Sequence, residues 1–116
     1  MSTLTIQWVK STTDTWLPFA TVNLSEVTTK GVYMIWYRGQ PGRVVYVGQG
    51  DVASRISAHR SEQEILAYQA NGLLVTWASV PKAQRDGVER YLADTWNPLV
   101  GDAHPDAEPI AVNSPW

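Results

Sequence analysis

Apolar and polar side chains alternate along parts of this chain and predict a series of short strands. Residues 4–9 alternate in the manner of a half-buried strand. Residues 32–37 and 43–47 are dense in β-branched and aromatic side chains, which favours two further strands. The connection over residues 38–42 holds two glycines and a proline, so we expect an antiparallel hairpin. A fourth strand is expected over residues 73–78.

Two glycines and an aspartate mark the end of the third strand. Gly48 and Gly50 are expected to break the strand, because glycine allows positive φ or a close backbone approach. Asp51 is a good N-cap, which predicts a helix that runs to about His59 or Arg60.

Two more helices are predicted further along. Ser61 and Glu64 have the spacing of a capping box, for a helix that ends near residues 71–72. Pro81 opens a longer helix that runs to about residue 96, where Pro98 stops it. Its expected apolar face consists of Val88, Tyr91, Leu92 and Thr95.

The remaining segments are predicted to be ordered connections. Residues 11–30 are rich in threonine and serine, with apolar anchors at Trp16, Leu17 and Phe19. The segment from Gly101 is rich in proline and aspartate, and we expect it to wrap the surface, held by Ile110, Val112 and Trp116. The order of elements predicts one α+β domain over residues 1–116, with a small, mainly antiparallel sheet flanked by helices.

Composition excludes several kinds of site. The chain has no cysteine, which excludes disulfides, thiolate zinc sites and a cysteine nucleophile, and fits a reducing compartment such as the cytoplasm. We expect no signal peptide, because no basic segment precedes an apolar run near the start. We expect no membrane helix, because no apolar run approaches about 18 residues.

Charge is unevenly distributed along the chain. The net charge of −2 argues against broad coating of nucleic acid. Residues 30–90 nevertheless carry eight basic and five acidic side chains, whereas residues 91–116 carry four acidic and no basic ones. This excess is compatible with a local phosphate-binding groove in the middle of the chain.

Six polar or aromatic positions form an ordered set in that middle region. Two strings, Gly31-Val32-Tyr33 and Tyr46-Val47-Gly48, place their tyrosines thirteen residues apart. Four polar side chains follow at increasing distance: Arg55, His59, Glu89 and Asn97. In order and approximate spacing, the set resembles the GIY-YIG nuclease family over roughly residues 31–98.

The resemblance implies a metal-dependent endonuclease that hydrolyses phosphodiester bonds of DNA. It implies that Tyr33 is the general base and that Tyr46 orients the water or the phosphate. It further implies that Glu89 binds Mg²⁺ or Mn²⁺ and that Asn97 supports the site through hydrogen bonds. RNA or branched nucleic acid remains open as the target.

The two tyrosines are suited to such chemistry if they share a face. Tyr33 and Tyr46 belong to neighbouring strands of the predicted hairpin, and the register decides whether they point the same way. A phenol beside a divalent cation loses its proton more easily and can then accept one from an attacking water. The alternative is that both are ordinary sheet residues.

Arg55 and His59 lie four residues apart and therefore share a face of the predicted helix, near its N-terminus. A helix N-terminus favours a phosphate, and arginine can hold its oxygens and stabilise charge in the transition state. Histidine can relay a proton or bind phosphate. The alternative is a solvated basic face that includes Arg60.

Glu89 lies next to the apolar stripe of its helix, so its carboxylate can lean toward the protein. A single carboxylate is enough for Mg²⁺, which usually keeps several waters. A solvated glutamate is the alternative. For Asn97 the alternative is a helix-ending residue. His104 has no partner at metal-binding spacing and is expected at the surface.

The sequence departs from the family pattern in three respects. The two tyrosines are slightly further apart than is usual, consistent with a longer hairpin turn. No lysine or arginine closely follows Tyr33, so a second cation would come from elsewhere, with Lys82 and Arg85 as candidates. No separate DNA-binding module is visible, which leaves target choice to loops, a homodimer or a partner protein. The missing second cation and the low net charge keep open a second hypothesis, a non-catalytic nucleic-acid-binding or protein-interaction module on the same fold.

Overall fold

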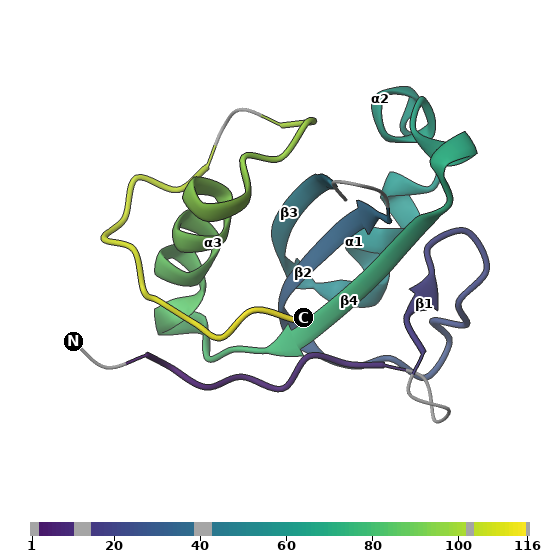
Figure 1. The fold of residues 1–116 in the computed structure, drawn as a ribbon. Coiled ribbons are helices and arrows are strands. Elements are labelled where there is room, and N and C mark those ends of the chain that lie inside the picture. The colour runs from purple at the N-terminus through teal and green to yellow at the C-terminus, as the bar shows by residue number, and fades with distance from the viewer. Residues whose placement is uncertain (1–2, 11–14, 39–42, 102–103, 116) are drawn as a thin grey trace.

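The computed structural model describes residues 3–10, 15–38, 43–101 and 104–115. The predicted α+β class is confirmed: the described residues form a four-stranded antiparallel sheet with the order β1-β4-β2-β3 (Figure 1). The strands are β1 (Leu17–Pro18), β2 (Lys30–Tyr37), β3 (Arg43–Asp51) and β4 (Leu73–Ser79). The helices are α1 (Val52–His59), α2 (Gln63–Leu66), the 3₁₀ turn η1 (Gln69–Asn71) and α3 (Lys82–Trp96).

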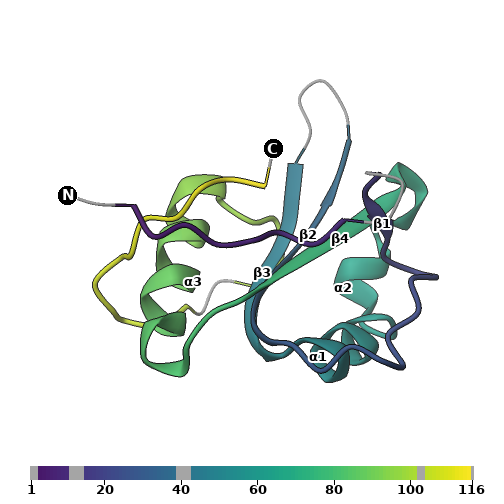
Figure 2. The same ribbon diagram turned by 90° about the horizontal axis from the view of Figure 1, so that it is seen from below.

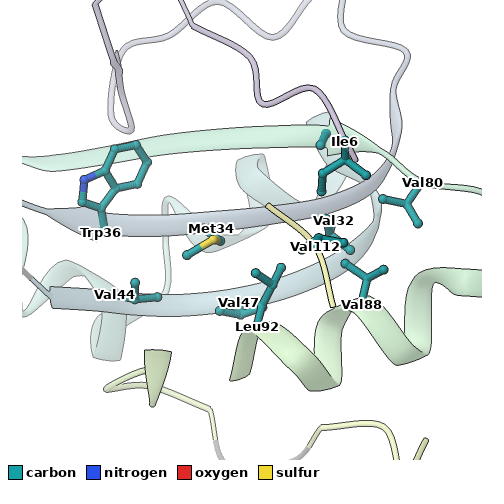
Figure 3. Packing of buried hydrophobic residues seen from close by; sticks show 11 residues of the cluster. Ile6, Val32, Met34, Trp36, Val44, Val47, Val80, Val88, Leu92 and Val112 are labelled. Carbon is teal, nitrogen blue, oxygen red and sulfur yellow. The ribbon is translucent and has the colours of Figure 1, made fainter. Parts of the chain in front are cut away.

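Helices cover the sheet from both sides. Figure 2 shows α3 on one side of the sheet and α1 and α2 on the other. Val32 and Met34 of β2 face the α3 side, where they belong to a cluster that includes Leu92 (Figure 3). Ile35 belongs to the opposite cluster, together with Ile56 of α1. The central strand is therefore buried on both faces, which explains its almost continuous apolar sequence.

The predicted strand over residues 4–9 is wrong. Leu4 forms an isolated bridge with Val112, and no regular ladder follows in the described residues. Instead, the Asn113 side chain satisfies Ile6: its Oδ1 accepts from the Ile6 N–H at 2.8 Å, and its Nδ2 donates to the Ile6 carbonyl at 3.0 Å. An amide side chain thus replaces a neighbouring strand. The connection over residues 11–30 contains a strand that was not expected, since β1 pairs with β4.

The prediction that Gly48 and Gly50 end the third strand is also wrong. β3 continues through both glycines to Asp51, and both pair with β2. The expected backbone freedom is used at Gly50, which has φ +124°. Asp51 caps α1 as predicted, because its side chain accepts a hydrogen bond from the Ser54 N–H at 3.3 Å.

The predicted capping box at Ser61 does not form. The Ser61 hydroxyl donates to the Ala58 carbonyl at 3.1 Å, so it closes the end of α1 and leaves α2 without a side-chain cap. The helical segment is broken into α2 and η1. It ends at Gly72, as predicted, and this glycine has the left-handed backbone conformation, φ +79°, that often ends a helix.

The long helix α3 begins at Lys82, one residue after the predicted start at Pro81, and ends at Trp96 as predicted. Val88 and Leu92 are buried on its inner face, but Thr95 is exposed, so its assignment to the apolar face is wrong. The predicted hairpin connection, beyond Arg38, lies outside the described residues. No helix in the described part of the chain is both long and apolar enough to cross a membrane.

The C-terminal segment is held along α3 by two of its three expected anchors. Ile110 donates its N–H to the Gly87 carbonyl at 2.9 Å, and Val112 is buried. A Cβ atom at Gly87 would lie 2.6 Å from the Ile110 side chain, so the glycine makes room for this segment. Trp116, the third expected anchor, lies outside the described residues.

Candidate active site

The hairpin register places the two signature tyrosines on one face of the sheet. Tyr33 is paired with Gly48, and Ile35 with Tyr46. Directly paired residues share a face, and so do residues two apart on one strand. Tyr33 and Tyr46 therefore point the same way, and their rings stack with centroids 6.0 Å apart and an angle of 17° between planes.

Both signature glycines are explained by close contacts. A Cβ atom at Gly48 would overlap the hydroxyl end of Tyr33, whose ring crosses this position. A Cβ atom at Gly31 would overlap the carbonyl of Ala78 on β4. Gly48 of the second string therefore leaves the space that the side chain of Tyr33 in the first string occupies.

Helix α1 adds His59 to the two rings. The Tyr33 hydroxyl lies 2.6 Å from Nε2 of His59, in a buried hydrogen bond, and the Tyr46 and His59 ring centroids are 4.4 Å apart. Burial lowers the pKa of His59, against the opposing effect of Glu62. The imidazole is therefore neutral near pH 7 and can accept the proton of the phenol.

Tyr33 itself is wholly buried, with an exposed fraction of 0%. Burial raises its pKa well above the ordinary value, and the neighbouring Tyr46 adds to this effect. Glu89 acts in the same direction, whereas Arg55 opposes it. In the resting protein Tyr33 is consequently a protonated hydrogen-bond donor.

The second nitrogen of His59 faces a carboxylate. Nδ1 lies 3.0 Å from Oε1 of Glu62, within ion-pair distance but without the alignment of a hydrogen bond. Within the described residues, this buried nitrogen has no hydrogen-bond partner. Glu62 was not among the residues singled out from the sequence. It follows His59 by three residues, a spacing at which side chains on a helical turn can meet, so the contact could have been predicted.

Arg55 lies at the solvent side of the cluster. It is exposed, and the aliphatic part of its side chain passes over Gly50, where a Cβ atom would be 3.7 Å from its Cγ. Hydrogen bonding to Tyr33 is the main cause that raises the pKa of the guanidinium, with a smaller contribution from Tyr46. A permanent positive charge thus lies beside both phenols and is open to an anionic ligand.

Arg60 does not belong to a solvated basic face with Arg55, which was the alternative interpretation of this helix. Arg60 folds back and donates to the carbonyls of Phe19 at 2.9 Å and Val22 at 2.7 Å. Arg85, a candidate second cation, donates to the Val80 carbonyl at 2.8 Å. Both arginines therefore hold loop backbone.

Glu89 of α3 is buried, with an exposed fraction of 7%, so the alternative of a solvated glutamate is excluded. Its Oε2 lies 3.1 Å from Nδ1 of His104. The expectation that His104 is a surface residue is wrong, since its side chain is only 14% exposed. Nothing in the sequence links the two, because the C-terminal segment that carries His104 has no periodic pattern.

A divalent cation is compatible with this pair. Among the described residues, no group of three or more His, Asp or Glu side chains converges. A single carboxylate with a neighbouring imidazole still offers oxygen and nitrogen donors to an ion that keeps several waters, such as Mg²⁺ or Mn²⁺. The residues present therefore fit the expected metal.

Asn97 ends α3 in the left-handed conformation, with φ +47°. It is exposed and lines an open hollow of about 450 Å³ with Arg90, Ala93, Asp94, Pro98, Gly101 and His104. Gly101 also adjoins the ring of Tyr46, with a Cβ position 3.0 Å from Cε2. Asn97 is thus separate from the ring cluster but borders a hollow that is also lined by Gly101, the neighbour of Tyr46.

The structure brings four predicted residues into one cluster: Tyr33, Tyr46, Arg55 and His59. Glu89 approaches from the other helix closely enough to affect the pKa of Tyr33. The chain matches no family model, and comparisons with curated proteins and with solved structures give no match.

Proposed function

We propose that this protein is a metal-dependent endonuclease that hydrolyses phosphodiester bonds of DNA in the manner of GIY-YIG nucleases. The observation that carries the proposal is the convergence of two phenols, an imidazole and a guanidinium from β2, β3 and α1, with a buried carboxylate nearby. We also place its action in the cytoplasm, because the chain lacks cysteine.

Arg55 is the proposed phosphate ligand. It is exposed and permanently charged, and it can hold two nonbridging oxygens at once. As charge builds up on the phosphoryl oxygens, the guanidinium stabilises the transition state. A bound phosphate also draws Arg55 away from the phenols, which it otherwise contacts.

Tyr33 and His59 form the proposed general base. As Tyr33 accepts a proton from the attacking water, its own proton passes along the 2.6 Å hydrogen bond to Nε2 of His59. Because Tyr33 is fully buried, water reaches its hydroxyl only after a neighbouring side chain shifts. We assign Tyr46 the orientation of the water or the phosphate.

Glu89, with His104 beside it, would hold the cation. When bound, Mg²⁺ or Mn²⁺ supplies charge stabilisation for the leaving oxygen. We propose that Asn97 supports the site through a hydrogen bond to the nucleic-acid backbone where it borders the hollow.

Supercoiled plasmid incubated with the protein and Mg²⁺ or Mn²⁺ tests the proposal. We expect nicked or linear product, lost with EDTA and reduced at least about 100-fold in Tyr33→Phe, Arg55→Ala and Glu89→Gln. Arg38→Ala is the matched control, since this exposed cation follows the end of β2, five residues after Tyr33 and roughly 16 Å away. Thermal unfolding of each variant separates lost chemistry from lost folding.

A wider panel of single-stranded, duplex and branched DNA and of RNA tests the target. Binding without cleavage of any substrate, in either metal, would establish the second candidate, a non-catalytic binding module. The burial of Tyr33 is the observation that favours this candidate. Stacking on exposed tryptophans receives no support, because every tryptophan in the described residues is buried or half-buried.

A further inference from the structure

A third side chain, Glu62, lies beside the ring nitrogen of His59 that Tyr33 does not contact. The Tyr33 hydroxyl is hydrogen-bonded to Nε2 of His59 at 2.6 Å. Oε1 of Glu62 lies 3.0 Å from the other ring nitrogen, Nδ1. His59 is 3% exposed, whereas the side chain of Glu62 is 47% exposed. An exposed carboxylate therefore lies beside the outer nitrogen of a buried imidazole.

We propose that Glu62 is a positioning residue that holds the proton of His59 on Nδ1, so that Nε2 is free to accept the proton of Tyr33. This inference rests on the proposed function for its catalytic meaning, but the tautomer it predicts is a property of the resting protein. Glu62 touches neither substrate nor metal in this assignment and acts only through His59.

The tautomer follows from the donors and acceptors available. A neutral imidazole carries one proton, and the nitrogen without it accepts. If Nε2 carried the proton, it would compete with the Tyr33 hydroxyl, and Nδ1 would present a lone pair to a carboxylate. With the proton on Nδ1, both contacts are favourable, and a small rotation of the exposed Glu62 side chain aligns the hydrogen bond. Buried polar atoms are seldom left without such a partner.

Charged and titratable groups around the ring act consistently with this assignment. Burial lowers the pKa of His59, Glu62 raises it, and Arg55 lowers it. The phenols of Tyr33 and Tyr46 face the ring from β2 and β3. Among these groups Glu62 is the one that stabilises the imidazolium formed when His59 takes the proton.

The test measures ¹⁵N-labelled histidine by long-range ¹H–¹⁵N NMR on the full chain without nucleic acid or metal. We expect the Nδ1–H tautomer for His59 in the wild type and in Glu62→Gln, whose amide oxygen can still accept. In Glu62→Ala we expect a shift toward the Nε2–H tautomer. The His59 pKa should fall in both variants, because each lacks the negative charge.

Glu64→Ala is the matched control. Glu64 is exposed and lies two residues after Glu62. Among the described residues, no ring contact or hydrogen bond links it to His59. Its removal should leave the tautomer and the pKa of His59 unchanged. An unchanged Nδ1–H tautomer in Glu62→Ala would overturn the inference, whatever happens to the pKa of His59.

Cleavage assays add the functional readout. Glu62→Ala should lower the rate at least about tenfold, with partial recovery in Glu62→Gln and a change in the acidic limb of the pH–rate profile. The two proposals fail separately. Absence of cleavage by the wild type on every substrate overturns the nuclease, whereas full activity and an unaltered profile in Glu62→Ala overturn the role of Glu62.

Discussion

At the scale of single residues, the two signature strings depend on each other sterically. The ring of Tyr33 occupies the space above Gly48, where any side chain would overlap its hydroxyl end. The same hydroxyl is fixed by His59 at 2.6 Å, so it has little room to retreat. Gly48 is therefore required for the position of Tyr33 and not for strand termination.

Gly48→Ala tests this contact. We expect a loss of about 1–3 kcal/mol in the free energy of unfolding, because the extra carbon displaces a fully buried ring. The His59 NMR resonances should shift as the Tyr33 hydrogen bond is disturbed. Urea unfolding and the ¹H–¹⁵N spectrum give the two readouts.

Gly72→Ala is the control for this substitution. Gly72 has φ +79° and open space around its Cβ position, so alanine costs about 1 kcal/mol through the backbone alone. We expect no shift of His59 in this variant. A Gly48→Ala protein with wild-type stability and spectrum would show that Tyr33 does not need the glycine.

Local spacing predicted some site residues and could not predict others. The i,i+4 relation placed Arg55 and His59 on one helix face, and the hairpin placed the two tyrosines on adjacent strands. His104 was missed because it reaches Glu89 from an irregular segment, where no period relates sequence to space. The burial of Tyr33 also depends on how α1 packs on the sheet, which no local pattern encodes.

At the scale of elements, prediction succeeded where backbone hydrogen bonds form regular ladders. β2, β4 and α3 meet this condition and agree with the predicted bounds to within two residues, whereas β3 runs on through Gly48 and Gly50 to Asp51. Prediction failed where a side chain takes the place of backbone, as Asn113 does for Ile6. The capping box failed for a related reason, since Ser61 bonds backward to α1.

Asn97 combines two roles that substitution can separate. Glycine adopts the left-handed conformation without strain, so Asn97→Gly should change the free energy of unfolding by no more than about 0.5 kcal/mol. Asn97→Ala should lose about 1 kcal/mol. If the amide donates one hydrogen bond to the nucleic acid, cleavage by Asn97→Gly falls about tenfold at unchanged stability. Chemical unfolding and plasmid nicking measure the two effects, and full activity would leave Asn97 as a helix-ending residue alone.

At the scale of the whole molecule, the sheet positions the tyrosines and His59 on the face that α1 covers, while Glu89 comes from α3. The radius of gyration, 13.3 Å, is that of one compact domain of this length. Arg55 presents its charge to solvent, whereas Arg60 and Arg85 are bound to loop carbonyls. Lys30, Arg38, Arg43 and Lys82 are also exposed, but the net charge of −2 gives the whole molecule no overall attraction for a nucleic-acid backbone.

The salt dependence of DNA binding should therefore be shallow. Each neutralised phosphate contributes a slope of about −0.9 in log K against log salt concentration. With contacts confined to Arg55 and its surroundings, we expect a total slope of about −2 to −3, measured by fluorescence anisotropy of a labelled duplex in EDTA. Arg55→Ala should reduce the slope by about 1 and weaken binding to all sequences alike, while the remote Arg38→Ala leaves it nearly unchanged. A slope of about −6 or steeper would mean an extended basic face, and the nucleic acid would then have to cross surfaces well beyond the cluster around Tyr33.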